Sequence, residues 1–261
     1  MKNNITVFLE IYNEEHRLKE CLENFTWAEE LVVFVKKSSD NSLNIAKIFA
    51  THVYEVDYCS ASENIVNNFK LHDPLEWVFY ITASSKIDKD LVHEINKLTS
   101  NPEFSYDVIG LPYEMYVFNL SGKFSPWYNE YKYPIIRKNS LKLSTELHKE
   151  IGWIGSNIFK IDSKKTKGRF KHFTHNNPDD FFNKHIRYVK YEANEYKHKY
   201  KNKALNKSII MFIKSIAFVF IKRKTVYKGK NGFILSMAYI SYYLMLMVFV
   251  WFNSKDKNTC H

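Results

Sequence analysis

The sequence predicts an α/β fold, with a mostly parallel sheet flanked by helices and with membrane-associating helices at the C-terminal end. Three observations support this fold class. Short apolar runs alternate with amphipathic stretches up to residue 98, a basic helix-forming segment follows Asn177, and residues 232–252 contain no charged side chain. Strands that alternate with helices usually form a parallel sheet. We therefore expect one domain at 1–175 and a second region, made of a basic helix and apolar helices, at 176–261.

The first part of the chain contains four strand–helix units. Apolar runs rich in β-branched and aromatic residues predict strands at 5–9, 30–35, 53–56 and 77–81. Apolar residues at helical spacing predict helices at 14–24, 42–50, 61–71 and 88–98. The carboxyl ends of parallel strands meet at one edge of a sheet, where ligands bind. Residues 12–15 and 82–84 follow two of these strands, so we expect them at that edge.

Residues 100–160 are less regular, with extended aromatic pieces separated by glycine and proline residues. This pattern predicts a β-rich lobe that closes over the ligand-binding edge. The run Asn177-Pro178-Asp179-Asp180 predicts the start of a long basic helix at about 178–204. Proline fits the first turn of a helix, and acidic side chains favour the positive end of the helix dipole.

The charge of the chain is unevenly divided. Residues 1–150 contain 16 Lys and Arg against 22 Asp and Glu, whereas residues 151–261 contain 22 against 6. A strongly basic region indicates a polyanionic partner, either nucleic acid or anionic membrane lipid. Apolar segments follow the basic helix, so we expect anionic membrane lipid as the partner and no nucleic acid.

Two apolar segments lie near the C-terminal end, at 208–221 and 232–252. The first is too short to cross a bilayer, whereas the second would be about 31 Å long as a helix, against a hydrocarbon core of about 30 Å. Tyr239 and Tyr243, in the middle of the second segment, suit an interface or a protein contact better than lipid. Interfacial or hairpin attachment, a true span and a buried soluble helix are therefore all open.

Cysteine usage and the N-terminal residues indicate the compartment. The three cysteines are scattered without Cys-x-x-Cys spacing, which fits a reducing compartment and gives no zinc or redox signature. The first apolar run is short and is broken by Glu10, so we expect no signal peptide. Both observations predict that the body of the protein lies on the cytoplasmic side of a membrane.

Several short motifs follow one another along nearly the whole chain. They are Tyr12-Asn13-Glu14-Glu15, Trp27 to Val33, Glu76-Trp77-Val78, Pro134 to Lys138, Leu147-His148, His172 to His175 and Gly229 to Gly232. Their order and spacing together resemble the family 2 glycosyltransferases, in particular the bacterial enzymes that add a sugar to the lipopolysaccharide inner core. The resemblance implies that residues 1–175 adopt a GT-A fold that binds a nucleotide sugar and transfers the sugar with inversion in a single displacement.

The chain departs from this family where the diphosphate is usually held. The family commonly uses Mg²⁺ or Mn²⁺ on an Asp-x-Asp motif, but Thr82-Ala83-Ser84 stands at that position, and Lys36 and Lys37 replace small residues. In one interpretation, the two lysines and the hydroxyls of Thr82 and Ser84 bind the diphosphate, and a divalent metal is not required. In the other, the pocket no longer binds a donor, and the protein is a catalytically silent scaffold or partner subunit.

The resemblance assigns candidate roles in binding the nucleotide sugar. Tyr12 would stack on the base, and Glu14 would accept a hydrogen bond from the ribose or base, although Glu14 also suits a helix start. Asp40 would contact the nucleotide or cap the following helix. The full set of candidates is Tyr12, Glu14, Lys36, Lys37, Asp40, Thr82 and Ser84, with no metal-ligating residue predicted.

Other residues are candidates for catalysis and acceptor binding. Glu150 is the preferred general base, with His148 and Glu146 behind it. The acceptor-binding candidates are Trp127, Arg137 and His172. Core packing of Trp127 and a structural ion pair of Arg137 are the plain alternatives.

Taken together, the residues and the resemblance predict a glycosyltransferase that moves a hexose from a nucleotide sugar donor to a lipid-linked cell-envelope glycan. The expected acceptor is a lipopolysaccharide or lipooligosaccharide core. The expected location is the cytoplasmic face of the inner membrane, with peripheral attachment or a C-terminal anchor.

Overall fold

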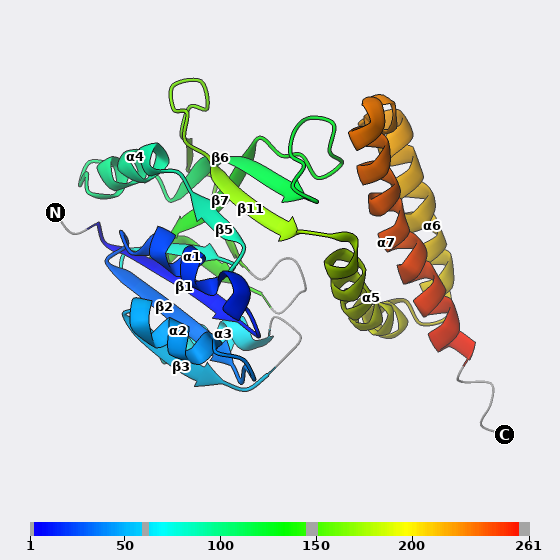
Figure 1. Cartoon of the computed structure of the whole chain (residues 1–261), viewed down its shortest axis with the longest axis horizontal. Helices are drawn as coiled ribbons and strands as arrows, with labels where there is room; N and C mark the ends of the chain where they lie inside the picture. The colour runs from blue at the N-terminus through cyan, green and yellow to red at the C-terminus, as the bar shows by residue number, and fades with distance from the viewer. Residues whose placement is uncertain (1–2, 59–62, 145–150, 256–261) are drawn as a thin grey trace. The chain divides into compact units, whose positions relative to one another are not determined.

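The computed structural model describes residues 3–58, 63–144 and 151–255. The chain forms two compact units (Figure 1). Unit 1 comprises Met1–Glu114 and Asn129–His172, and unit 2 comprises Met115–Tyr128 and Phe173–His261. Most of the strands belong to unit 1, and the long C-terminal helices belong to unit 2.

A nine-stranded sheet forms the centre of unit 1, with the strand order β3-β2-β1-β4-β7-β6-β11-β5 and with β10 beside β6. The bounds are β1 (Ile5–Ile11), β2 (Glu30–Lys36), β3 (His52–Val56), β4 (Trp77–Ile81), β5 (Ser85–Ile87), β6 (Val108–Val117), β7 (Tyr131–Arg137), β10 (Ile158–Lys160) and β11 (Phe170–His175). Strands β3, β2, β1 and β4 are parallel, whereas β7 is antiparallel to β4 and β6. The predicted α/β class with a sheet flanked by helices is confirmed.

The β-rich lobe expected at 100–160 is only partly separate from this sheet. β7 pairs with β4, where Arg137 lies opposite Trp77, and β6 pairs with β7 in turn. Both strands therefore extend the central sheet. Only β8 (Leu141–Leu143) and β9 (Ile151–Trp153) form a two-stranded sheet of their own. Sequence periodicity does not reveal antiparallel pairing between segments so far apart in the chain.

Helices cover both faces of the parallel strands. The helices of unit 1 are α1 (Glu15–Phe25), α2 (Ser42–Phe49), α3 (Glu63–Leu71) and α4 (Lys89–Thr99). Phe69 of α3 packs on Phe8 of β1 with ring centroids 4.4 Å apart, whereas Phe25 of α1 meets Phe79 of β4 at 5.6 Å. Phe8 lies opposite Tyr80, so Phe8 and Phe79 point to opposite faces. Each buried phenylalanine contributes about 1.5–3 kcal/mol.

The α-helices in the described part of unit 2 are α5 (Pro178–Tyr200), α6 (Ala204–Ala217) and α7 (Gly229–Lys255). The predicted start of α5 is confirmed, because the side chain of Asn177 accepts a hydrogen bond from the backbone N–H of Asp180 at 2.8 Å. The helix ends at Tyr200 rather than near residue 204. Lys201 adopts a φ of +48°, which is incompatible with a continuous right-handed helix.

Helices α6 and α7 pack side by side as a hairpin (Figure 1). The turn between them contains a π-helical segment, Phe218–Lys222, and a 3₁₀ segment, Thr225–Tyr227. The hydroxyls of Thr225 and Ser236 lie 2.9 Å apart. A Cβ at Gly232 would lie 2.3 Å from the carbonyl oxygen of Thr225, so glycine at this position lets the turn approach α7.

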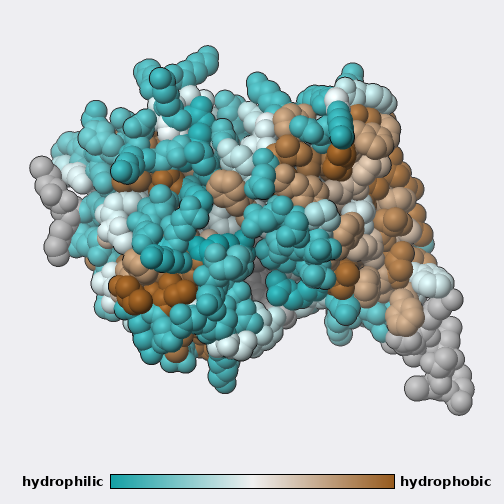
Figure 2. All heavy atoms as spheres, viewed as in Figure 1, coloured by the Kyte–Doolittle hydropathy of each residue, from teal (hydrophilic) through white to brown (hydrophobic). Residues whose placement is uncertain are grey.

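The helices of unit 2 expose an apolar surface. By length and composition, the helical segments Pro178–Lys222 and Gly229–Asn253 could each cross a membrane, which corrects the expectation that the apolar segment at 208–221 is too short to do so. Only 22% of the apolar window in each segment is buried. Figure 2 shows apolar atoms gathered over α6 and α7. The exposed apolar residues there are Ile210, Ile213, Ile221, Phe233, Ile234, Leu244, Val248, Trp251 and Phe252. Such a surface suits lipid better than water, which argues against a buried soluble helix.

A close backbone approach at Gly168 positions β11, and we predict that Gly168→Ala destabilises unit 1. A Cβ there would lie 2.7 Å from the backbone nitrogen of Leu91. Crowding of this kind costs about 1–3 kcal/mol, and it would disturb the hydrogen bond from the backbone N–H of Arg169 to Asp88. Thermal unfolding of the full chain measures the effect. Gly152→Ala is the matched control, because among the described residues the nearest atom to its Cβ would be the carbonyl oxygen of Lys142, at 3.9 Å. Equal melting temperatures for the two variants would contradict the prediction.

Candidate functional site

The carboxyl ends of β1, β2, β3 and β4 form one edge of the sheet, which we call the carboxyl edge. Because these strands are parallel, the residues that follow them emerge on the same side. Tyr12 follows β1, Lys37 follows β2, Asp57 follows β3 and Thr82 follows β4. The structure thus brings the predicted residues 12–15, 36–40 and 82–84 to a single edge.

Two loops of the carboxyl edge are bound to each other through Asn13. Its backbone N–H donates to the hydroxyl of Ser38 at 3.1 Å, and its side-chain oxygen accepts from the backbone N–H of Ser39 at 2.8 Å. Asn13 has a φ of +55°, a left-handed conformation that asparagine tolerates well. The loop after β1 and the loop after β2 therefore act as one support.

Asp40 completes this support. Its carboxylate accepts hydrogen bonds from the backbone N–H groups of Glu15 and Ser42, each at 3.0 Å. Burial by itself would raise the pKa of Asp40, but the hydrogen bonds from Ser42 and Glu15 outweigh it and lower the pKa of this carboxyl. Asp40 thus links the first residue of α1 to the first residue of α2, whose N-cap residue is Asn41.

Tyr12 and Tyr58 form an exposed aromatic pair at the carboxyl edge. Their ring centroids lie 4.5 Å apart, and the side chains are 38% and 45% exposed. Exposed aromatic faces are surfaces on which a nucleobase can stack. Glu14, two residues after Tyr12, accepts a hydrogen bond from Nε of Arg17 at 2.5 Å.

The two candidate lysines have different environments. The ammonium of Lys36 lies 2.5 Å from the carboxylate of Glu10, and both side chains are largely buried, at 15% and 11% exposure. Asn68 of α3 also donates to Glu10 at 2.5 Å. Lys36 therefore belongs to an internal ion pair on the α3 face of the sheet, and we do not assign it to the diphosphate.

Lys37 remains at the carboxyl edge. Its ammonium pairs with Asp57, which raises the pKa of Lys37, and the two side chains are 69% and 84% exposed. Exposed pairs of this kind contribute little to stability, so an incoming anion can replace Asp57 at low cost. The φ of +43° at Lys37 is unusual for a residue other than glycine, asparagine or aspartate. Strained residues of this kind cluster at functional sites.

Thr82 lies at the centre of a polar chain. Its hydroxyl lies 2.9 Å from that of Ser84, 3.2 Å from that of Ser85 and 3.2 Å from Nε2 of His172. On the other side, Nδ1 of His172 lies 3.1 Å from the phenol oxygen of Tyr113. Burial raises the pKa of Tyr113, so its phenol stays protonated. The structure therefore brings Thr82, Ser84 and His172 together, although sequence analysis assigned them to different substrates.

The direction of these hydrogen bonds depends on which ring nitrogen of His172 carries the hydrogen. A neutral imidazole donates at one nitrogen and accepts at the other. With its hydrogen on Nε2, His172 accepts from Tyr113 and donates to Thr82, and the hydroxyl hydrogen of Thr82 is then available to Ser84 or to a bound anion. These hydrogen-bonded side chains can therefore supply neutral donors at the end of β4.

Sequence analysis missed two residues of α1, of which Cys21 contacts Thr82 and Arg17 contacts Glu14. The thiol of Cys21 on α1 donates to the carbonyl oxygen of Thr82 at 3.6 Å, and burial raises the pKa of this thiol to about 12. Arg17 lies one helical turn earlier and pairs with Glu14. The spacing of Glu14, Arg17 and Cys21 on one helical face is the signal that could have revealed them.

The remaining candidates are Arg137 and Trp127, predicted to bind the acceptor, and Glu150 and His148, predicted to act in catalysis. Arg137 pairs with Glu76 and covers the ring of Trp77 at 4.4 Å, at the start of β4 rather than at its carboxyl end, and burial lowers the pKa of its guanidinium. Trp127 belongs to unit 2, where it packs edge-on against Phe181 and Tyr239. Glu150, His148 and Glu146 lie outside the described residues.

The residues at the end of β4 do not fit a divalent metal of the Mg²⁺ or Mn²⁺ type. Such ions prefer carboxylate and carbonyl oxygens that balance their charge. The contacts of the Thr82 hydroxyl are with two neutral hydroxyls and an imidazole. These three groups therefore carry no negative charge that would balance such an ion.

Comparison with known proteins does not establish a family. The chain matches no protein-family model and no curated protein. Among solved structures, it is similar to S. aureus TarS, with 16% identity over 84% of this chain and 44% of that chain and a TM-score of 0.47. It is also similar to TarS 1-349, with 15% identity over 93% of this chain and 81% of that chain and a TM-score of 0.45.

A third similar structure is glucosyl-3-phosphoglycerate synthase from Mycobacterium tuberculosis in complex with Mn²⁺, uridine-diphosphate and glucosyl-3-phosphoglycerate. Its identity is 14% over 54% of this chain and 60% of that chain, with a TM-score of 0.36. The chain spans 44% of the length of the longer TarS structure. Similarity at this level does not identify a function, which has to be inferred from the residues of this chain.

The internal pair of Lys36 and Glu10 predicts a specific stability pattern. Lys36→Met should lower the free energy of unfolding by about 3 kcal/mol, because it leaves the Glu10 carboxylate buried without its cation. The double variant Lys36→Met/Glu10→Leu should recover most of this loss. Denaturant unfolding of the full chain measures both values. Lys138→Met is the matched control, since Lys138 and Asp73 form an exposed pair, and a loss equal to that of Lys36→Met would contradict the internal role.

Proposed function

We propose that this protein is a glycosyltransferase that moves a hexose from a nucleotide sugar to a lipid-linked cell-envelope glycan without a divalent metal at the diphosphate. The observation that carries the proposal is the convergence of Tyr12, Lys37 and the Thr82–Ser84–His172 chain at the carboxyl edge of the parallel strands. This is the edge at which α/β folds bind ligands.

Charge balance explains how a diphosphate could bind without a metal. A pair of aspartates would repel the diphosphate unless a cation lay between them. Hydroxyls at positions 82 and 84 remove this repulsion and donate hydrogen bonds instead, and the ammonium of Lys37 supplies the positive charge. Without the two carboxylates, the repulsion that a metal would neutralise is absent, so the diphosphate does not need a metal.

The exposed pair of Tyr12 and Tyr58 supports nucleotide binding. Their rings offer a stacking surface for a base beyond the end of β1. His172 is better suited to the diphosphate or leaving group than to the acceptor, because its Nε2 contacts Thr82. The general base stays assigned to Glu150, with His148 behind it, as sequence analysis predicts.

The exposed apolar helices support a lipid-linked acceptor. An enzyme bound to a membrane through α6 and α7 meets acceptors that are confined to the same surface. Lys222, Arg223 and Lys224 follow α6 and favour anionic lipid, with each charge contributing about 1 kcal/mol near such a surface. These features support attachment to a membrane. The cytoplasmic face of the inner membrane, and a lipopolysaccharide or lipooligosaccharide core as acceptor, are the parts of the proposal that rest on the family resemblance of the sequence.

One observation favours a second candidate function. Lys36, one of the two predicted cations for the diphosphate, neutralises Glu10 instead. With fewer cations at the carboxyl edge, a catalytically silent scaffold that brings partners to the membrane is the competing function.

A transferase assay on the full chain in vesicles separates these functions. We expect turnover with one of several nucleotide sugars on a lipid-linked core glycan, and we expect the same turnover in the presence of a chelator. Lys37→Ala should lower kcat/KM about 10- to 100-fold, the loss expected for a charge-assisted hydrogen bond. Lys138→Ala, which disrupts a similar exposed ion pair away from the carboxyl edge, should leave kcat/KM unchanged.

Two results would argue against the proposal. Loss of turnover on chelation would contradict the metal-free mechanism. Absence of turnover with every donor, from a protein that still binds vesicles, would favour the silent scaffold.

A further inference from the structure

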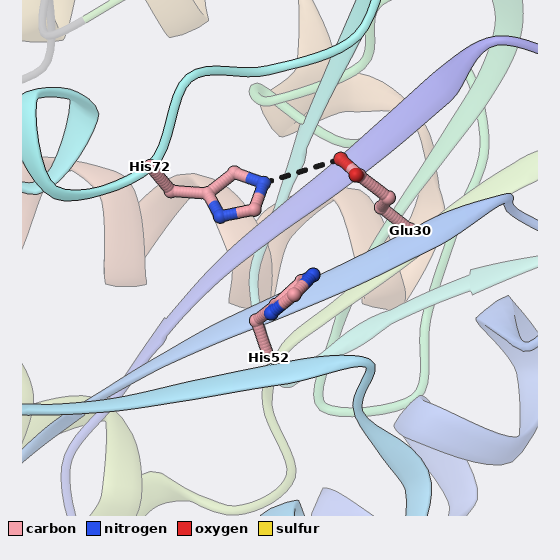
Figure 3. Close-up of side chains that lie close together, drawn as sticks. All are labelled: Glu30, His52 and His72. Carbon is pink, nitrogen blue, oxygen red and sulfur yellow. Dashed lines mark hydrogen bonds and ion pairs between the residues drawn. The ribbon is translucent and has the colours of Figure 1, made fainter.

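Three potential metal ligands converge at the amino ends of β2 and β3 (Figure 3). Glu30 is the first residue of β2, His52 is the first residue of β3, and His72 directly follows α3. One ligand atom from each residue lies within 4.8 Å of the other two. Nε2 of His72 lies 3.1 Å from Oε2 of Glu30.

This cluster is far from the carboxyl edge. It lies at the opposite ends of the same parallel strands, and six residues of extended chain separate Thr6 from Tyr12, which corresponds to about 20 Å. A metal bound here could not contact a diphosphate held near Thr82. The cluster is therefore independent of the proposed transferase site.

We propose that Glu30, His52 and His72 form a binding site for a divalent transition metal ion of the Zn²⁺ type. Two imidazoles and one carboxylate are a ligand set that zinc commonly uses, with bonds of about 2.0–2.2 Å. In tetrahedral geometry such bonds place the ligand atoms about 3.3–3.5 Å apart. The separation of 3.1 Å between His72 and Glu30 is close to this value. The side chain of His52 is exposed, so rotation about its side-chain bonds can bring a ring nitrogen to bonding distance from the ion.

The surrounding residues hold two of the ligands in place. The hydroxyl of Thr6 donates to Oε2 of Glu30 at 2.7 Å and itself accepts from the backbone N–H of Leu75 at 2.9 Å. The phenol oxygen of Tyr54 lies 3.1 Å from Nδ1 of His72. This contact leaves Nε2, the nitrogen that faces Glu30, as the ligand atom. Partners of this kind orient metal ligands and increase affinity.

An ion pair between Glu30 and His72 explains only part of this arrangement. It would not need a second imidazole, yet the ring centroid of His52 lies 4.8 Å from that of His72. In a metal site, His52 has a clear role as the third ligand. Because His52 is exposed, the fourth position would be open to water, as in zinc sites with three protein ligands.

The donor atoms also select the type of ion. Mg²⁺ and Mn²⁺ favour oxygen ligands, whereas imidazole nitrogen suits zinc and its neighbours in the first transition row. Bound zinc would connect β2, β3 and the end of α3. It would therefore stabilise the folded chain, by a free energy that grows with the logarithm of the free zinc concentration above the dissociation constant.

The test uses metal titration of the full chain, purified without a histidine tag and treated with chelator. Calorimetry with zinc chloride gives stoichiometry and affinity, and cobalt chloride gives a ligand-sensitive absorption spectrum. All variants carry Cys59→Ser and Cys260→Ser, so that these thiols do not bind the ions. We expect one ion per chain, a cobalt spectrum without thiolate charge-transfer bands, and a melting temperature that rises with zinc.

Variants of His52 and Glu30 test whether these residues are metal ligands. His52→Ala and Glu30→Gln should each weaken zinc binding by more than tenfold and abolish the rise in melting temperature. Glu30→Gln preserves the shape of the side chain, so it remains informative if a histidine variant folds poorly. His93→Ala, which removes an exposed histidine from α4, should bind zinc as the parent does. Failure to bind an ion, or unchanged affinity in both His52→Ala and Glu30→Gln, would overturn the proposal.

Discussion

The parallel pairing of β1 with both β2 and β4 is the constraint on which the rest of unit 1 depends. Leu9 lies opposite Val33 on one side and Ile81 on the other, so all three strands end at the same edge. A shift of one residue would turn every buried side chain to the opposite face of the sheet. The apolar contacts of Phe8 with α3 and of Phe79 with α1 therefore fix the register. The same contacts bring the loops after these strands together.

The two edges of these strands differ in their chemistry. The carboxyl edge offers hydroxyls, an imidazole and the exposed ammonium of Lys37, which suit an anion. The amino edge offers two imidazoles and a carboxylate, which suit a transition metal. The largely buried pair of Lys36 and Glu10 lies near the carboxyl ends of β2 and β1 and carries no net charge. The proposed anion-binding and cation-binding sites of unit 1 therefore lie at opposite ends of the same parallel strands.

Sequence patterns predicted the local elements well because apolar periodicity and caps are local properties. The helix start at Asn177 and the strands at 5–9 and 77–81 are examples. The pattern did not predict that β7 pairs with β4, because such contacts join distant segments. It also assigned Lys36 to the diphosphate, since spacing alone does not show that Glu10 lies beside it. The meeting of His52 and His72 has no sequence signature, because a helix and a loop separate them.

The central claim is that hydroxyl and ammonium groups at the carboxyl edge bind a sugar diphosphate without a metal. The most direct measurement is calorimetry of uridine, guanosine and adenosine diphosphates with the full chain in the presence of a chelator. The account predicts that one of these binds to the parent protein and binds more weakly to Thr82→Val, which keeps the shape of the side chain but removes the hydroxyl. Absence of binding until Mg²⁺ or Mn²⁺ is added, or equal binding to Thr82→Val, would contradict it.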